Sequence, residues 1–497
     1  MDSQAVHEWV ASFRLDWVGV APLLGVTALA ILVMGVEAFL PRWTRLPAFL
    51  AFFGLGAAAW FTYDSIEEGR PVFGGMLVYD DIGLPCFLIV LSIGMFVSLI
   101  SPLTIRRRDT SGGEYYSLVV FAALGLSFLA ISRELITLFI NLEIGSLALY
   151  VLSLLERRVR RSSEAAIKYF LLGAFSSALI VMGIAFLYGA TGQTNLDAIH
   201  NTLASDRGET PARATWAVIG LGLLVAGVSF KLTLVPFHLY APDVYEGAPT
   251  PVTALIATAS KVAGFAVLAS VVLAVTPGGA RDESAGLLVD SLGVKTRAVL
   301  WLLAAASMVV GNLLAVAQPN IKRMLAFSSV AHSGYMTLGL LAVAAGAQNA
   351  IDSLLLYLLA YSLMTLLAFG VASALGERGE AAIADYAGLA RRSPFMALGM
   401  TLAMLSLTGI PPTIGFAGKF YVFRAAIDTG YTWLVIIGVL TSVWSAYYYL
   451  RVIVYMYMAE PGTEWEPAPV PFLNRFALTF CSLLILVLGV APRLLGR

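Results

Sequence analysis

Charged residues are scarce in this chain. They make up 12% of its 497 residues, whereas about a quarter of a typical soluble protein is charged. Hydrophobic residues make up 59%, and the mean hydropathy is +0.84. Apolar stretches of about 20 residues recur along the whole chain, and each is long enough to cross the hydrocarbon core of a bilayer. The composition argues against a large soluble core and predicts a multi-span membrane protein.

Cysteine and histidine are also scarce. Cys86 and Cys481 stand far apart in apolar runs, which argues against a disulfide framework or an iron–sulfur cluster, and we interpret both as small buried hydrophobes. Four histidines argue against a haem-rich or metal-rich protein. The sequence contains no phosphate-binding loop, catalytic triad or paired metal ligands. No connecting segment is large enough for a soluble domain, so we expect any nucleotide or flavin to bind elsewhere.

Apolar runs and loop signals together predict an all-α protein of about fourteen transmembrane helices. The N-terminal segment lacks the basic start and cleavage site of a signal peptide, so the first apolar run is expected to remain as a helix. The predicted spans lie approximately at 17–40, 45–63, 82–102, 114–131, 134–155, 163–190, 214–239, 252–276, 297–317, 323–345, 350–375, 393–427, 431–458 and 472–492.

Arginines cluster after the first, third and fifth predicted spans, and these loops lie on one face of the membrane. Cytoplasmic loops are enriched in lysine and arginine, so this face is predicted to be cytoplasmic. An even number of spans then places both termini on the periplasmic face. The arginines concerned are Arg42, Arg45, Arg106, Arg107, Arg108, Arg157, Arg158, Arg160 and Arg161.

Two long predicted spans are interrupted by proline, at Pro236 and at Pro411–Pro412. Proline removes a backbone N–H and its ring clashes with the carbonyl four residues earlier, here that of Leu232, which frees polar groups that lipid cannot satisfy. Interrupted helices at corresponding places in two halves indicate a transport pathway between inverted repeats. We therefore predict two units, formed by spans 4–8 and 9–13.

The chain has six lysines against 25 arginines, and four of these lysines fall inside apolar spans. Arginine keeps its proton, whereas a buried lysine can release one because desolvation disfavours its charge. Burying each charge costs roughly 2.5–3.5 kcal/mol on insertion scales, so such residues usually face a polar interior and serve a pathway. The four are Lys168, Lys231, Lys261 and Lys419, whereas Lys295 and Lys322 are expected in loops or at helix ends.

Other interpretations of these residues remain open. Lys168 lies near the edge of its span, where its side chain can simply reach the interface. The other three lysines can serve structural salt bridges alone, and His238 and His332 can be either hydrogen-bonded interior residues or proton relays. Glu143, predicted to be buried in mid-span, makes a Glu143–Lys231 pair a candidate switch of proton affinity, because each charge stabilises the other.

Three stretches of the chain together resemble one known family. They are "FKLTLVPFHLYAPDVYEGAPTPVTA" followed by Lys261, then "IKRMLAFSSVAHSGYM" and "SLTGIPPTIGFAGKFYVF". From about Glu143 to Tyr449 the chain is similar to the antiporter-like subunits of the bacterial proton-pumping NADH:quinone oxidoreductase, respiratory complex I. The phrase "APDVYEGAPTPV" and the lysine at position 419 resemble the subunit N branch.

The resemblance implies a fold of two inverted five-helix repeats, each containing a broken helix and half a proton channel. It implies a chain in the bacterial inner membrane, in contact with other membrane-arm subunits. NADH, FMN, iron–sulfur clusters and quinone would be bound by those partner subunits and not by this chain. Matching motifs place Glu143, Lys231, Lys261, Lys419, His238, Lys168 and His332 on the path of the protons.

The chain is accordingly divided into residues 1–110 (spans 1–3), 111–278 (the first repeat), 279–458 (the second repeat) and 459–497 (the last span). Two alternative functions remain open. One is a subunit of a cation/proton antiporter complex, which resembles this family in fold and lysine pattern. The other is a membrane subunit of a hydrogenase-linked or photosynthetic complex.

Overall fold

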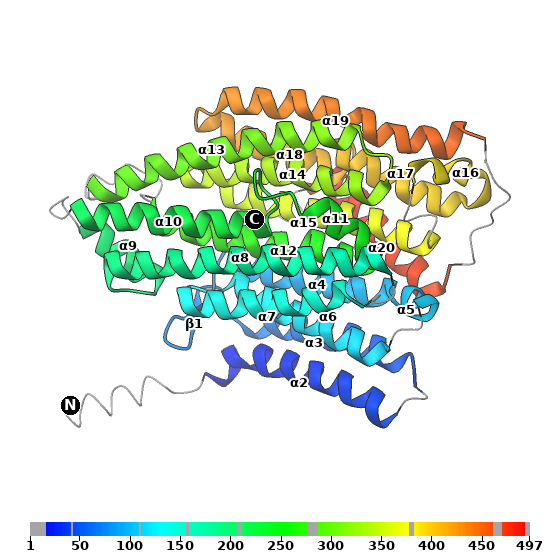
Figure 1. Cartoon of the computed structure of the whole chain (residues 1–497), viewed down its shortest axis with the longest axis horizontal. Helices are drawn as coiled ribbons and strands as arrows, with labels where there is room; N and C mark the ends of the chain where they lie inside the picture. The colour runs from blue at the N-terminus through cyan, green and yellow to red at the C-terminus, as the bar shows by residue number, and fades with distance from the viewer. Residues whose placement is uncertain are drawn as a thin grey trace.

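Long helices lie side by side throughout the computed structural model of the chain (Figure 1). The structure describes residues 16–40, 43–108, 111–155, 159–205, 211–276, 287–376, 382–460 and 470–492. The N-terminal half contains α2 (Trp17–Phe39), α3 (Leu46–Ser65), β1 (Arg70–Val72), β2 (Leu77–Tyr79), α4 (Gly83–Ile100), α5 (Pro102–Arg108), α6 (Gly112–Ala130), α7 (Leu135–Ser153), α8 (Arg160–Thr191), α9 (Leu196–Ser205), α10 (Pro211–Lys231), α11 (Ala241–Gly247) and α12 (Thr250–Val275).

The named elements of the C-terminal half are all helices in its described part. It contains α13 (Leu287–Val316), α14 (Ile321–Ala344), α15 (Ala350–Leu375), the 3-10 turn η1 (Ile383–Tyr386), α16 (Leu389–Arg392), α17 (Pro394–Thr408), α18 (Ile414–Asp428), α19 (Thr432–Met458) and α20 (Phe472–Val490). The strands β1 and β2 form an antiparallel hairpin in which Arg70 faces Tyr79.

Twelve of the described helices are long and apolar enough to cross a membrane. The helix α14 has 24 residues, about 36 Å at 1.5 Å per residue, but it carries more polar side chains. The helices α17 and α18, each of 15 residues, follow one another across a short break. With α14 and this pair counted as one crossing each, the predicted fourteen spans and the all-α fold are confirmed.

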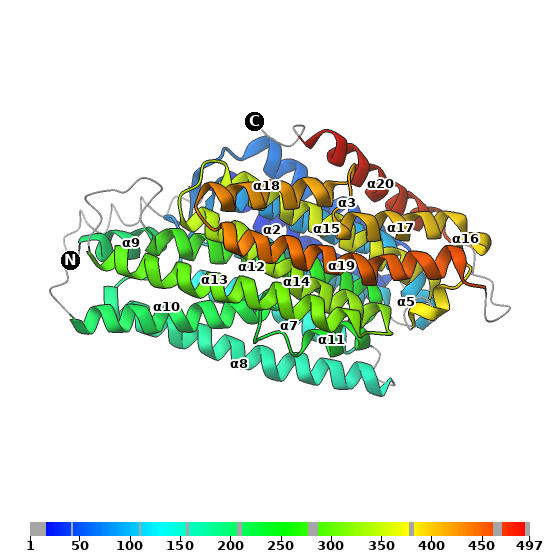
Figure 2. The same cartoon turned by 90° about the horizontal axis from the view of Figure 1, so that it is seen from above.

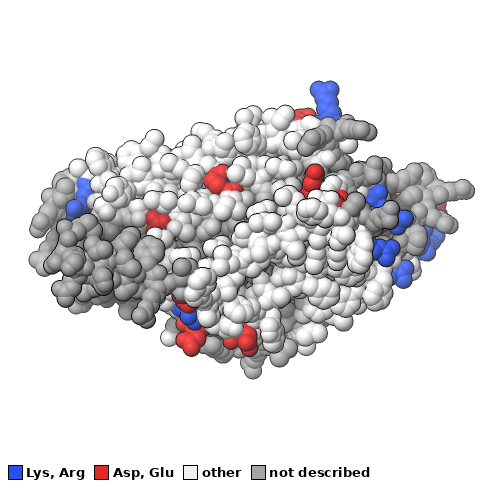
Figure 3. All heavy atoms as spheres, turned by 90° about the horizontal axis from the view of Figure 1, so that it is seen from below, with Lys and Arg blue, Asp and Glu red and all other residues white. Residues whose placement is uncertain are grey.

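The short elements lie toward the two ends of the bundle, and we name each end after one of its short helices. The hairpin and α9 lie at the α9 end, whereas α5, α11 and α16 lie at the α11 end (Figure 1). In the face shown in Figure 3, lysine and arginine gather mainly toward one end, and the long middle carries almost none. A few Asp and Glu residues lie in the middle of the same face, but most of its described surface is neither acidic nor basic.

The helix α12 forms the centre of the bundle. It packs against α4, α6, α14 and α15, and all its side chains except Leu273 are buried. Seen from above, α8 and α10 lie on one side of α12, and α18 and α20 lie on the other (Figure 2). A polar side chain on α12 is therefore surrounded by protein on all sides, which is the position of Lys261.

The first helix break begins earlier than the prolines predict. The helix α10 ends at Lys231, five residues before Pro236, and Thr233 has a left-handed backbone with φ of 55°. The expected clash between the Pro236 ring and a helical Leu232 carbonyl is therefore wrong, because the helix has already ended there. The Leu232 carbonyl instead accepts a hydrogen bond from Ser333 Oγ at 2.6 Å.

The second break lies where the prolines predict it. The helix α17 ends at Thr408, and Gly409 adopts φ of 89° while its N–H donates to the Leu405 and Ser406 carbonyls. A left-handed glycine of this kind ends many helices. Residues 409–413, which include Pro411 and Pro412, then lead into α18. Both breaks therefore interrupt a membrane crossing with irregular backbone that is enclosed by other helices.

Gly183 on α8 and Gly220 on α10 allow these two helices to approach closely. A Cβ atom on Gly220 would lie 2.8 Å from Leu187 N and 2.9 Å from Gly183 O, whereas a Cβ atom on Gly222 would meet nothing within 4 Å. We expect Gly220→Ala to destabilise the protein by about 1–3 kcal/mol through overpacking. Gly222→Ala, in the same helix, should be neutral or slightly stabilising.

The thermal midpoint of the purified protein in detergent measures this difference. A lower midpoint for Gly220→Ala alone is the expected result. Equal midpoints for the two variants would show that α8 and α10 are not in close contact at Gly220.

Candidate functional site

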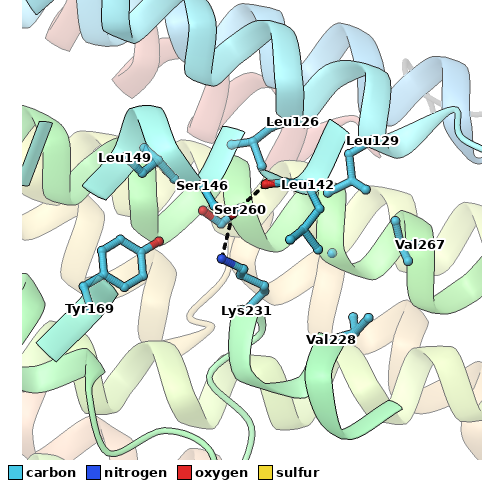
Figure 4. Close-up of a pocket in the computed structure, with 11 residues that line it drawn as sticks. Leu126, Leu129, Leu142, Ser146, Leu149, Tyr169, Val228, Lys231, Ser260 and Val267 are labelled. Atoms are coloured by element: carbon cyan, nitrogen blue, oxygen red, sulfur yellow. Dashed lines mark hydrogen bonds between the residues drawn. The ribbon is translucent and has the colours of Figure 1, made fainter. Parts of the chain in front are cut away.

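Lys231 is the last residue of α10 and is 7% exposed. Its Nζ donates to Ser146 Oγ at 2.7 Å and to Tyr150 OH at 3.0 Å, both on α7. The ring of Tyr169 on α8 lies beside the ammonium, with its centroid 5.9 Å away. Figure 4 shows Lys231 directed into a small pocket beside Ser146 and Ser260. The charge is therefore held by hydroxyl oxygens and aromatic faces.

Glu143 differs from its predicted setting. It lies in the middle of α7, as predicted, but its side chain is partly exposed and not buried. Its carboxylate accepts a hydrogen bond from Ser177 Oγ on α8. Within the described residues no ion pair of 4 Å or less joins Glu143 to Lys231, although both have described positions. Ser146, one turn nearer the α11 end of α7, instead accepts a hydrogen bond from Lys231.

Lys261 lies in the middle of α12 and is 1% exposed. Its Nζ donates three hydrogen bonds: to Thr233 Oγ1 at 2.9 Å, to the Ser329 carbonyl at 2.6 Å and to Ser333 Oγ at 2.5 Å. Thr233 belongs to the first break, whereas the two serines belong to α14. The lysine therefore joins the first break to α14 through all three of its N–H groups.

His332 lies on the same turn of α14 as these serines and is 1% exposed. Its Nδ1 lies 2.8 Å from Tyr357 OH on α15, and its Nε2 lies 3.2 Å from Tyr449 OH on α19. Both nitrogens thus have a hydroxyl partner that can donate or accept a proton.

Lys419 lies on α18, just after the second break, and is 5% exposed. Its Nζ donates to the Leu407 carbonyl at 3.1 Å, to the Thr408 carbonyl at 2.9 Å and to Ser442 Oγ at 2.8 Å. The two carbonyls lie at the end of α17, where the break leaves them without helical partners. The lysine therefore satisfies the polar groups that the break exposes, at the negative end of the helix dipole.

These residues form a row through the centre of the bundle, which we call the polar axis: Lys231, Lys261, His332 and Lys419. Tyr361 lies between two of its members, with its ring centroid 5.4 Å from Lys261 Nζ and 5.4 Å from the His332 ring. Tyr335, one turn beyond His332 on α14, has its ring 5.7 Å from the His332 ring and 5.0 Å from Lys419 Nζ. Amines, imidazole and hydroxyls can each take up and release protons, so the arrangement suits stepwise proton transfer with water in the gaps.

His238 lies between the first break and α11, apart from the polar axis. It is buried, its ring contacts Phe327, and its Nδ1 has no hydrogen-bond partner in the part of the chain that the structure describes. An unpaired buried nitrogen is a place where a water molecule would bind. The structure does not bring His238 into hydrogen-bond contact with the lysines of the axis.

Lys168 takes part in a cluster of ion pairs at the α11 end. Its Nζ lies 2.8 Å from Glu164 Oε1 and 2.6 Å from Asp243 Oδ2. Arg323 on α14 pairs with Asp243 at 2.8 Å and with Glu246 at 3.0 Å. Burial raises the pKa of Asp243, but the hydrogen bonds from Lys168 and Arg323 outweigh it and hold that pKa below its ordinary value. This cluster ties α11 to α8 and α14.

Several members of this region are not predicted by the sequence. Lys322 lies at a helix end as predicted, as the second residue of α14, but its side chain is only 1% exposed and donates to the Ala248 carbonyl at 2.6 Å. Asp243, Glu246 and Arg323 were not considered as partners. The signal was present in "APDVYEG", where two acidic residues stand three apart beside the first break, and so lie on one face of a helix.

Comparison with known proteins gives a consistent result. The family model for the NADH:quinone oxidoreductase/Mrp antiporter membrane region matches residues 132–445. NADH-quinone oxidoreductase subunit N 2 of Roseiflexus castenholzii is 40% identical over 488 residues, which cover 96% of this chain and 94% of that protein. NADH-quinone oxidoreductase subunit N of Trichlorobacter lovleyi is 38% identical, covering 95% and 93%.

Solved structures show the same relationship at the level of the fold. A chain of respiratory complex I from Thermus thermophilus has 34% identity and a TM-score of 0.78, covering 95% of this chain and 98% of that one. A chain of the Mrp complex from Dietzia sp. has a TM-score of 0.78 at 20% identity, which shows a likeness of fold alone. By its motifs, its length and its fold, the chain belongs to the NADH:quinone oxidoreductase/Mrp antiporter family and, within it, to the subunit N group of NADH-quinone oxidoreductases.

Proposed function

We propose that this chain moves protons across the membrane as part of the membrane arm of an NADH:quinone oxidoreductase. The observation that carries the proposal is the polar axis, in which three lysines and a histidine are buried between two helix breaks. Subunit N relatives match nearly the whole chain. NADH oxidation and quinone reduction, with their FMN and iron–sulfur clusters, then belong to partner subunits.

In this proposal the two ends of the bundle face opposite sides of the bacterial inner membrane. The loops at the α11 end carry the arginine clusters, so we infer that this end faces the cytoplasm and that both termini face the periplasm. Protons would enter beside His238 and the first break, pass along Lys231, Lys261 and His332, and leave beyond Lys419. Glu143 and Lys168 would adjust the charge near the entrance.

The breaks also support the proposed division into repeats. We infer that α6–α12 form the first repeat, residues 111–278, and that α13–α19 form the second, residues 279–458. The fourth crossing of each repeat is the broken one. The two broken crossings span the bundle in opposite directions. Residues 1–110 and 459–497 flank the repeats.

Lys231→Ala should assemble into the complex but lose most of the proton translocation driven by NADH oxidation, because the axis loses its first buried carrier. The measurement is the proton gradient formed by the complex in sealed proteoliposomes, set against its rate of quinone reduction. Lys295→Ala is the matched control, because Lys295 is exposed at the α9 end of α13. Pumping at the wild-type level in Lys231→Ala would remove this lysine from the path.

His332 offers a test that separates proton transfer from packing. His332→Gln replaces the imidazole by an amide, which can still hydrogen-bond to Tyr357 and Tyr449 but cannot take up and release a proton. We therefore expect this variant to reduce pumping at least tenfold. If His332→Gln pumps normally while His332→Leu does not, the histidine has a structural role only. Both variants are compared by pumping per quinone reduced and by thermal midpoint.

Co-purification in mild detergent distinguishes the proposal from a cation/proton antiporter or a hydrogenase-linked complex. We expect this chain to purify with quinone-reducing subunits that contain flavin and iron–sulfur clusters. A stable assembly without these subunits would contradict the proposal and favour the antiporter.

A further inference from the structure

A second cavity, of about 400 Å³, lies at the α9 end of the bundle. It is lined by ionisable and polar side chains from several elements, among them Asp80, Arg133, Asp197 and His200. Arg133 forms an ion pair with Asp80, and His200 Nδ1 lies 2.9 Å from the Ala274 carbonyl near the end of α12. A liquid-like water occupies about 30 Å³, so this cavity, whose lining contains both polar and apolar side chains, has room for several.

The small pocket at Lys231 extends from the ammonium toward this cavity. Lys231, Ser146 and Ser260 form its polar end, whereas Leu129, Leu142 and Val267 line it nearer the α9 end. Figure 4 shows the same order, with Lys231 and Tyr169 toward one side and Leu129 and Val267 toward the other. The pocket therefore leads away from the first break and not toward it.

The two cavities are lined by nearby residues of the same segments of the chain. On α12, Val267 lines the Lys231 pocket and Ser270 lines the cavity at the α9 end; they are three residues apart, about 4.5 Å along the helix. Leu129, near the end of α6, lines the Lys231 pocket, and Arg133, four residues later in the connection to α7, lines the cavity at the α9 end. On both segments only three or four residues therefore separate the two linings.

That separating layer is closed by aliphatic side chains but also contains a polar pair. Leu129, Leu142 and Val267 are each no more than 2% exposed. Beside them along the chain, the buried Asn141 Nδ2 donates to Ser132 Oγ at 3.1 Å. An apolar constriction of this thickness excludes water and interrupts proton transfer, and it conducts once it is wetted.

We propose that the cavity at the α9 end is a second aqueous outlet for the proton of Lys231, closed in this structure by a plug of Leu129, Leu142 and Val267. When the plug is wetted, an N–H bond of the ammonium breaks, a water molecule takes the proton, and a neutral amine remains. The proton reaches the cavity, where the imidazole of His200 or bulk water accepts it. The neutral amine is reprotonated from the first break.

This inference rests on the proposed function, because it takes Lys231 to be a proton carrier. It adds that this one lysine has access to both ends of the bundle, with the plug preventing a leak. The path does not involve Lys261, His332 or Lys419.

The test is the passive proton flux through the intact complex in proteoliposomes, driven by an imposed pH gradient without NADH or quinone. Leu142→Ser places a hydroxyl in the plug and should raise the flux severalfold over wild type. Leu149→Ser is the matched control, because Leu149 lines the same pocket on the same helix but on the other side of Ser146. We expect it to leave the flux at the wild-type level.

Two further variants make the result decisive. Val267→Thr keeps the shape of the side chain and should also raise the flux above that of wild type. It replaces Leu142→Ser in the test if that variant assembles poorly. Adding Lys231→Ala to Leu142→Ser should abolish the extra flux. Wild-type flux in both plug variants, or an extra flux that survives Lys231→Ala, would overturn the inference. The pumping test of Lys231→Ala alone addresses the proposed function separately, because it requires NADH.

Discussion

The structure depends on one constraint: polar groups freed from a helix inside a membrane must find partners within the protein. Lipid offers no hydrogen bonds, and each unsatisfied backbone group costs several kcal/mol. At the first break, Ser333 donates to the Leu232 carbonyl and Lys261 to Thr233. At the second break, Lys419 donates to the carbonyls of Leu407 and Thr408. The breaks and the buried lysines therefore require one another.

This mutual requirement links the protonation of each lysine to the geometry of a break. A lysine ammonium has three N–H groups, and Lys261 and Lys419 each donate three hydrogen bonds. A neutral amine has only two N–H groups. Release of a proton from either residue therefore leaves one acceptor unpaired in a buried site, so the break or a water molecule must rearrange. Such a rearrangement gives a physical route by which proton transfer and helix geometry influence one another.

The sequence contained enough information for the spans and for much of the polar axis. Apolar length located the fourteen crossings, and the scarcity of lysine identified Lys231, Lys261 and Lys419 as buried residues. Pro411 and Pro412 located the second break because the helix ends just before them. Pro236 also lies within the first break, but it does not mark the end of the helix, since α10 ends at Lys231, before the left-handed Thr233. Threonine carries no strong local signal for that conformation.

Contacts between distant segments were also beyond sequence reasoning. Which neighbour Glu143 contacts depends on how α7 and α8 pack, and these helices place Ser177 beside its carboxylate. The burial of Lys322 has the same origin, because its partner, the Ala248 carbonyl, lies 74 residues earlier. Hydropathy reports whether a segment enters the membrane, but it does not report which neighbour a side chain meets.

The choice of partners separates the two groups of buried or partly buried lysines by chemistry. Lys168 pairs with the carboxylates of Glu164 and Asp243 at the α11 end, and a nearby negative charge holds a lysine in its protonated form. Lys231, Lys261 and Lys419 are instead held by hydroxyls, carbonyls and aromatic rings. These partners are neutral, so the contacts that hold these three lysines include no fixed negative charge. The carboxylates thus suit a fixed anchor for α11, whereas the neutral partners suit residues that must gain and lose a proton in turn.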